Sequence, residues 1–281
     1  MWLDSAYCIV NKPANICIDG TDSITMEKLT TSTLDAMGHE YGGKIRNCHQ
    51  LDKLTSGLLI YGLAKKATTK MNQLMQNRKI SKIYYAVVHG HITETAHFLL
   101  DFPIAENGRD PKREQIGNDQ NEGRPSITEC WVESIGYFKS VPVSVLRVRL
   151  WTGRKHQIRL HLSHIGHAVV GDPAYSERAH LFDRLYLDAH RMIFGKKRQR
   201  IDVQTESNQE FHKLIMDQNG SNLNRHSDHG EDEEEQLLLD HDVYRHSLLV
   251  PFIMNSDETD IQILVRKQPK SDRFPSEMYS E

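Results

Sequence analysis

The 281-residue chain lacks any apolar run that approaches the roughly 18 residues needed to span a membrane. Cysteine is scarce and scattered, and the four residues Cys8, Cys17, Cys48 and Cys130 form no Cys-x-x-Cys pair. Neither a disulfide framework nor a thiolate zinc site is therefore predicted. The first ten residues carry an acid and no basic segment before a long apolar stretch, which argues against a secretory signal. We expect a soluble, intracellular protein, cytoplasmic or nuclear, with no membrane partner.

Charge is distributed unevenly along the chain. Residues 201–281 carry 18 acidic and 7 basic side chains, whereas residues 1–200 carry 20 acidic and 28 basic ones. A basic body favours a polyanionic partner, although an ordinary surface followed by a solubilising acidic tail would give the same balance. We place the domain boundary at residue 200, between a folded body (1–200) and an acidic, partly disordered extension (201–281).

Within this extension, residues 218–235 have almost no large apolar side chains and are predicted to be disordered, because they bury too little surface to offset the entropy of ordering. The acidic run could fold back onto the basic body and compete with a polyanion, or simply be solvated. Residues 244–254 and 261–265 would form a hairpin or stay unstructured.

Hydrophobic periodicity predicts both strands and helices. Strands are expected where the chain is apolar, β-branched or alternating: residues 6–12, 58–61, 83–88 and 143–151. Residues 65–80 predict a helix whose apolar stripe is Ala67, Met71, Leu74 and Met75 and whose solvent face is basic. A second helix is predicted at 156–165, ended by Gly166. Residues 105–125 are rich in Gly, Pro, Asn and charge, and predict a long, mobile loop.

Three polar segments could carry chemistry. His49-Gln50-Leu51-Asp52 precedes Thr-Ser-Gly in a turn-rich stretch, where the carboxylate could simply accept from backbone amides. Lys82-Ile83-Tyr84-Tyr85 lies in a predicted strand, where tyrosines usually pack half-buried. Thr152-Gly153-Arg154-Lys155-His156-Gln157-Ile158-Arg159 opens a predicted helix, where amides and cations favour an anion. Each segment also has an ordinary structural explanation, but together they are specific.

In this order and spacing, the three segments resemble the signatures of the RluA-type pseudouridine synthases, which isomerise uridine in RNA. In that family a His-Arg-Leu-Asp-x-x-Thr-Ser-Gly loop carries the catalytic aspartate, a Lys-x-Tyr strand carries an active-site tyrosine, and a Thr-Gly-Arg-x-His-Gln-(Ile/Leu)-Arg segment supplies an arginine. The corresponding residues here are Asp52, Tyr84 and Arg159. Further matches are Asn11-Lys12-Pro13, Gly166-His167, Val170-Gly171-Asp172 and Tyr175, so that the resemblance covers about residues 6–200.

The resemblance implies an α+β fold with a mixed, mostly antiparallel sheet flanked by helices, and an RNA-modifying isomerase that needs no cofactor and no metal. Asp52 would act on a flipped-out uridine, Arg159 would keep it ionised and oriented, and Tyr84 would stack on the uracil and could help to remove its C5 proton. The RNA (ribosomal, transfer or messenger) would contact His49, Gln50, Lys82, Arg147, Arg149, Arg154, His156 and Gln157. We expect a monomer without the S4 domain that some relatives carry before the catalytic domain.

Two departures from the family pattern matter. Gln50 replaces the usual arginine beside the catalytic Leu-Asp, and Leu187-Asp188-Ala189-His190 stands where Leu-His-Ala is usual. Gln50 leaves open a second function, a catalytically impaired RNA-binding protein that retains the fold.

Two other motifs suggest different roles. The histidines at 156, 161, 164 and 167 could indicate zinc, but no Cys or carboxylate lies at a familiar ligand spacing. Residues 196–200 are a basic run that would serve either as a nuclear import signal or as an ordinary basic element end.

Overall fold

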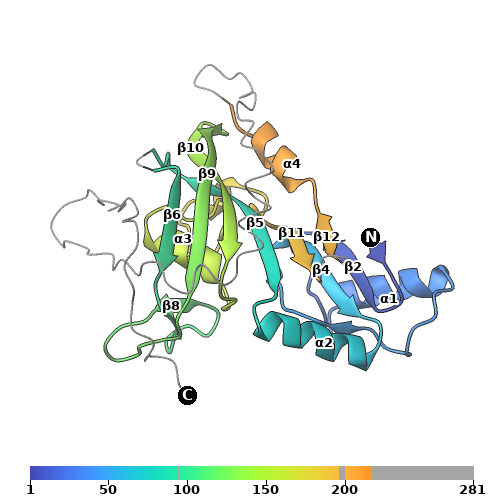
Figure 1. Ribbon diagram of the computed structural model, residues 1–281. Helices are drawn as coiled ribbons and strands as arrows, with labels where there is room; N and C mark the ends of the chain where they lie inside the picture. Colours follow the sequence, from blue (N-terminus) through green and yellow to red (C-terminus); the bar gives the residue numbers. More distant parts are fainter. Residues whose placement is uncertain (94, 196–199, 217–281) are drawn as a thin grey trace, which may run out of the picture. The chain divides into compact units, whose positions relative to one another are not determined.

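The computed structural model describes residues 1–93, 95–195 and 200–216. The predictions for residues 218–235, 244–254 and 261–265, and for most of the basic run at 196–200, lie outside the described residues. A ten-stranded sheet dominates the described part, with the strand order β1-β2-β4-β11-β5-β10-β9-β6; β3 adds to β4, and β12 adds to β11 (Figure 1). The strands are β1 Trp2–Leu3, β2 Tyr7–Lys12, β3 Arg46–Asn47, β4 Ser56–Gly62, β5 Ile80–His89, β6 His97–Asp101, β9 Ile127–Phe138, β10 Val141–Leu150, β11 Leu187–Phe194 and β12 Ile201–Gln204.

The sheet is mixed and mostly antiparallel, as predicted: β4 pairs with β11 in parallel, whereas the pairs along the rest of the sheet are antiparallel. At the parallel pair, Gly57 lies opposite Ala189 with a φ of +109°, and an added Cβ would overlap the backbone of Ala189. The β4–β11 contact therefore needs glycine at this position, directly after the turn that carries Asp52.

Helices pack on both faces of the sheet. On one face, α1 (Met26–Ala36) and α3 (Gln157–His164) bury Leu34, Ile158 and Leu162 in a core shared with Leu59 and Val148. Helix α2 (Lys65–Gln76) buries Met71 in a second core cluster. Helix α4 (Ser207–Lys213) buries Phe211 in a third. A short 3-10 helix, η1, covers Ala179–Leu181. No helix in these described ranges is long and apolar enough to cross a membrane.

The predicted strands and helices are present, with one helix shorter than expected. The helix predicted over 65–80 ends at Gln76, and Ile80 already belongs to β5. Arg78 adopts a left-handed φ of +53°, and the Lys79 N–H donates to the carbonyl of Leu74 at 2.8 Å. This arrangement satisfies the last helical carbonyls and turns the chain away from the helix axis.

The prediction of a loop throughout 105–125 is wrong in part. Strands β7 (Ile104–Glu106) and β8 (Glu114–Ile116) pair as a small antiparallel sheet. Glu114 is buried and its carboxylate lies 2.8 Å from the Lys155 ammonium at the start of α3. Contacts to a distant part of the chain thus hold a segment whose own composition favours a loop.

Strand β12 and helix α4 follow residue 200, where we placed the domain boundary. Strand β12 pairs with β11 over Arg191–Phe194, and Phe211 of α4 packs in a core cluster with Tyr85 and Val145. These two elements therefore join the folded body, and the boundary at residue 200 stays a prediction.

Candidate active site

Asp52 lies in the turn that precedes β4. Its backbone carbonyl accepts a hydrogen bond from the Thr55 N–H at 3.1 Å. The fully buried Lys12, at the end of β2, donates from Nζ to the carbonyls of Lys53 at 2.9 Å and Ile16 at 3.0 Å. Both contacts fix the backbone beside Asp52, and about a quarter of the Asp52 side chain remains exposed.

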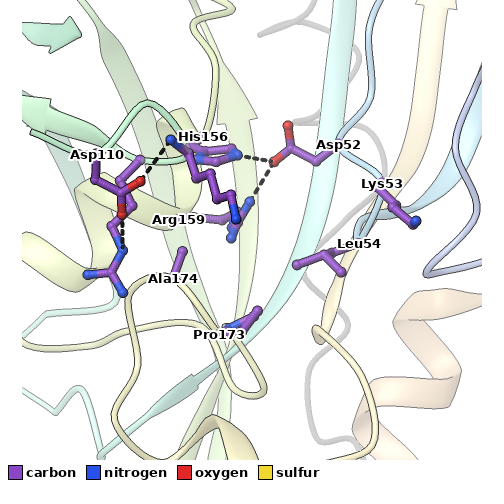
Figure 2. A pocket seen from close by; sticks show the side chains of 10 residues that line it. Asp52, Lys53, Leu54, Asp110, His156, Arg159, Pro173 and Ala174 are labelled. Carbon is purple, nitrogen blue, oxygen red and sulfur yellow. Dashed lines mark hydrogen bonds and ion pairs between the residues drawn. The ribbon is translucent and has the colours of Figure 1, made fainter. Parts of the chain in front are cut away.

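The guanidinium of Arg159 joins Asp52 to a second carboxylate. Arg159 lies in the first turn of α3, is almost completely buried, and donates from Nη1 to Asp52 Oδ2 at 3.0 Å (Figure 2). Its Nε and Nη2 donate to the two carboxylate oxygens of Asp172, each at 2.7 Å. Burial by itself lowers the pKa of this guanidinium, but the bonds and charges of Asp172 and Asp52 raise it above its ordinary value. Arg159 is therefore a fixed cation that holds the Asp52 carboxylate in place.

Asp172 was not among the predicted site residues, although the resemblance includes Gly171-Asp172. The side chain is fully buried, and its Oδ1 also accepts from the backbone N–H groups of Ala174 at 2.9 Å and Tyr175 at 3.3 Å. The carboxylate is thus satisfied from two directions and sets the plane of the Arg159 guanidinium. An acidic residue in a Gly-Asp-Pro turn gives no signal in the sequence that it faces an arginine.

His156 precedes α3 and lies between Asp52 and Tyr175. Its Nε2 is 3.8 Å from Asp52 Oδ2, and its Nδ1 is 3.0 Å from the Tyr175 hydroxyl. Burial lowers the pKa of the imidazole, although the charge of Asp52 acts in the opposite direction. Its backbone is left-handed, with a φ of +55°, which is uncommon for a residue other than glycine.

A cavity of about 410 Å³ opens over these side chains. Residues 52–54, His156, Arg159 and the 173–174 turn form part of its lining (Figure 2). Asp110, Lys112 and Arg113 from the segment between β7 and β8 form the rest. We missed these three residues because the sequence of this segment predicts only a mobile loop.

Tyr84 lies in β5 and is buried in the same core cluster as Leu51, the neighbour of Asp52. Burial raises the pKa of the Tyr84 hydroxyl, and the charges of Asp52 and Asp188 raise it further. The phenol is therefore held in its protonated form.

The other residues predicted near Asp52 differ in exposure. Gln50 is exposed, and so is Arg154. The backbone N–H of Ile60 donates to His49 Nε2 at 3.2 Å, and burial, aided by the charge of Lys82, lowers the pKa of His49 to about 4. Burial also lowers the pKa of Lys82. His49 is thus a neutral structural contact of β4, while Gln50 and Arg154 are available to a ligand.

Arg147 and Arg149 lie away from the cavity. Val148 pairs with Tyr84 and shares its core cluster, so the alternating neighbours Arg147 and Arg149 point to the opposite face of the sheet. Arg147 Nε donates to Glu133 at 2.8 Å, and Arg149 is buried.

Gln157 is also buried, and its amide is satisfied by the protein. Its Oε1 accepts from Thr152 Oγ1 at 2.8 Å and from the Arg154 N–H at 3.0 Å, while its Nε2 donates to the carbonyl of Ile127 at 2.9 Å and to Thr128 Oγ1 at 3.0 Å. These bonds tie the start of α3 to β9. The geometry favours an organising role, and RNA contact by this side chain stays a prediction.

The histidines at 156, 161, 164 and 167 do not converge on one point. His161 Nε2 bonds the carbonyl of Phe102 at 2.9 Å, and His167 Nδ1 bonds the carbonyl of His89 at 2.8 Å. Within residues 1–93, 95–195 and 200–216, no group of three His, Cys, Asp or Glu side chains could hold a metal ion. The zinc alternative therefore has no geometric support.

Comparison with known proteins identifies the family. The model of the RNA pseudouridylate synthase family matches residues 6–164, more than half of the chain, and the protein belongs to this family. The RNA pseudouridylate synthase domain-containing protein 1 of Danio rerio is 35% identical over 190 residues, which cover 63% of this chain and 63% of the relative. That of Homo sapiens is 31% identical over 210 residues, covering 71% of this chain and 65% of the relative. The chain thus spans less than two thirds of the length of these curated relatives.

Solved structures agree with this assignment. A structure of human RNA Pseudouridylate Synthase Domain Containing 1 matches with a TM-score of 0.66 and 27% identity, over 84% of this chain and 92% of that chain. Human RNA Pseudouridylate Synthase Domain Containing 4 matches with a TM-score of 0.60 at 18% identity and supports the fold alone. The predicted family and the predicted α+β fold are confirmed.

Proposed function

We propose that the protein converts uridine to pseudouridine in RNA, with Asp52 acting on a uridine that has flipped out of the RNA into the cavity. The observation that carries the proposal is the Asp52 carboxylate, which Arg159 holds at 3.0 Å and which faces a cavity of about 410 Å³. A carboxylate fixed beside such a space can reach a nucleoside without moving.

The reaction is an isomerisation, so atoms and electrons balance within the nucleotide. The N1–C1′ bond breaks, the uracil turns, a C5–C1′ bond forms, and the C5 proton leaves as N1 gains one. Asp52 attacks C1′ or C6, or takes a proton from C2′. No group is gained or lost, and the reaction needs no cofactor.

Arg159 and Tyr84 take different parts in this proposal. Arg159 fixes the orientation of the Asp52 carboxylate through Nη1, and Asp172 fixes Arg159 in turn through Nε and Nη2. Burial and the neighbouring carboxylates raise the pKa of Tyr84, so it meets the substrate as a neutral phenol. In this form Tyr84 would stack on the uracil, and its help in removing the C5 proton stays a prediction.

The RNA backbone would lie across the cationic side chains around the cavity. Exposed Lys53, Lys112 and Arg113 line the cavity, and exposed Arg154 and Lys155 precede α3. Such side chains bind phosphates without reading sequence. Arg147, Arg149 and Gln157 are buried or face the opposite side of the sheet, so their predicted contact with RNA gains no support from this surface.

The proposal is tested by tritium release from RNA labelled with [5-³H]uridine, prepared from cells that lack the protein. Wild type should release tritium, whereas Asp52→Asn should fall to background and still bind RNA. Asp202→Asn, outside the cavity, is the matched control and should release tritium as wild type does. RNA binding without release by folded wild-type protein would instead favour the non-catalytic RNA binder that Gln50 suggests.

A further inference from the structure

His156 lies between Tyr175 and Asp52, and a hydrogen bond with Tyr175 orients its ring. Tyr175 lies on the Nδ1 side, at 3.0 Å. Asp52 lies on the Nε2 side, as Figure 2 shows. The ring is mostly buried, and the backbone is left-handed. Left-handed backbone at a residue with a side chain is disfavoured, and such residues concentrate at functional sites.

The contacts of the Tyr175 hydroxyl favour one tautomer of the His156 imidazole. The Tyr175 oxygen already accepts the Glu114 N–H at 2.8 Å, so its own proton must go to another acceptor. Two acceptors are within reach, His156 Nδ1 at 3.0 Å and the Glu114 carbonyl at 3.4 Å, and the nearer one is the imidazole. When Nδ1 accepts, a neutral imidazole carries its proton on Nε2.

The Nε2–H then faces Asp52, which lines the same cavity, and among the residues that the structure describes no acceptor lies within hydrogen-bond distance of Nε2. The Asp52 oxygen on that side is 3.8 Å away, which is longer than a hydrogen bond. The donor can therefore bond a group that enters the cavity between His156 and Asp52. A group that bonds this N–H must be a hydrogen-bond acceptor.

We infer that the Nε2–H of His156 donates a hydrogen bond to a carbonyl oxygen of the target uracil, and that Tyr175 acts as a positioning residue by fixing this tautomer. The inference rests on the proposed function and deepens it, because it assigns a base-reading contact to the site. Uracil has carbonyl oxygens at C2 and C4, on both sides of N3. Cytosine keeps the C2 oxygen but carries an amino group at C4, so a donor placed to bond the C4 oxygen is left unpaired against cytosine, which disfavours cytidine.

The tautomer is measured directly by ¹⁵N NMR of the histidine rings in the full-length protein, with His156 assigned by its absence from the His156→Gln spectrum. We expect a proton on Nε2 in wild type and a mixture of tautomers in Tyr175→Phe. A proton on Nδ1 in wild type would overturn the inference. This measurement does not depend on turnover.

The functional test compares tritium release by variants at low RNA concentration. Glutamine can place an N–H close to the position of the imidazole Nε2, so His156→Gln should retain activity within about fivefold of wild type, whereas His156→Phe should lose about 100-fold. Tyr175→Phe alone should lower the rate of tritium release several-fold. In the His156→Gln background the same change should lower this rate by less, since an amide has no tautomer to fix. Equal losses for the Gln and Phe variants, or equal Tyr175→Phe effects in both backgrounds, would overturn the inference.

Contact with the base is separated from support of Asp52 by measuring RNA binding in the Asp52→Asn background, where no charge at position 52 needs support. At a salt concentration that suppresses binding through phosphates, adding His156→Phe should weaken binding about tenfold. Unchanged affinity would refute the base contact. His180 is an exposed histidine in η1, so His180→Phe is the matched control and should change neither RNA binding nor tritium release.

The outcomes for the proposed function and for this inference can be told apart. Absence of tritium release by wild type would refute both together, whereas an active wild type with an equally active His156→Phe would refute this inference alone.

Discussion

Asp172→Asn should destabilise the protein far more than the same change in an exposed ion pair. Arg159 donates two 2.7 Å hydrogen bonds to Asp172, and both side chains are almost completely buried. Removing one partner of a buried pair leaves an uncompensated charge and costs about 3–5 kcal/mol. Asparagine still offers one oxygen to Arg159 and to the backbone, so we expect about 3 kcal/mol, the lower end of that range.

The chain contains a matched control for this change. Arg191 Nε and Nη2 bond the two oxygens of Asp202 at 2.9 and 2.8 Å, in the same two-pronged arrangement but with the side chains partly exposed. Exposed pairs contribute about 1 kcal/mol or less. Asp202→Asn should therefore change the free energy of unfolding by no more than about 1 kcal/mol.

The assay is urea denaturation followed by circular dichroism, with thermal denaturation as a second measure. For the folded body, about 3 kcal/mol corresponds to a fall in Tm of roughly 6–12 °C. Equal losses for Asp172→Asn and Asp202→Asn would refute the reasoning, because burial is the feature that distinguishes the two pairs. A loss confined to activity, with unchanged stability, would also contradict it.

Three further predictions follow from the same structure. Gln157→Ala should lower the free energy of unfolding by about 3 kcal/mol in urea denaturation, because several buried partners of the amide lose their bonds; a loss below about 1 kcal/mol would contradict this organising role. Burial lowers the pKa of His161 to about 4, so the unfolded chain takes up a proton as the pH falls below its ordinary value of 6.5 while the folded chain does not. The stability that neutral His161 provides is lost between pH 6.5 and 4, and His161→Phe should show a shallower acid decline in urea midpoints; an identical decline would refute this. The double variant Lys112→Ala, Arg113→Ala should weaken RNA binding and lower the slope of log Kd against log salt by about two, and an unchanged slope would remove both side chains from the RNA surface.

Sequence periodicity was sufficient for the regular elements with one clear apolar face. Helix α2 has the predicted stripe around Met71, and β10 alternates as expected between the core at Val148 and the face of Arg147. The end of α2 was misplaced because Arg78, a side-chain-bearing residue, adopts the left-handed conformation that usually signals glycine.

Elements stabilised by distant polar contacts were not predictable in this way. Strand β11 lies in the middle of the sheet but contains Asp188 and His190, which interrupt an apolar pattern. Asp188 is buried because it accepts from Ser56 and Thr205, residues far from it in the sequence. The β7–β8 segment likewise depends on the Glu114 contact with Lys155. No local sequence pattern indicates such partners, because they are distant in the sequence.

The site was predicted in part. The family motifs indicated Asp52 and Arg159, which are 107 residues apart and bonded in the structure. They did not reveal that Asp172 completes the ion-pair arrangement, or that Lys112 and Arg113 form a wall of the cavity. Motif spacing locates residue types along the chain, but the side chains that surround them are set by tertiary packing.

The role of Asp52 is tested by measuring the product itself. RNA from cells that lack the protein is incubated with wild type or Asp52→Asn, digested to nucleosides and separated by chromatography. We expect wild type to form pseudouridine in an amount equal to the uridine lost, with no added cofactor, and Asp52→Asn to form none. Pseudouridine formation by Asp52→Asn at the wild-type level would contradict the assignment of Asp52.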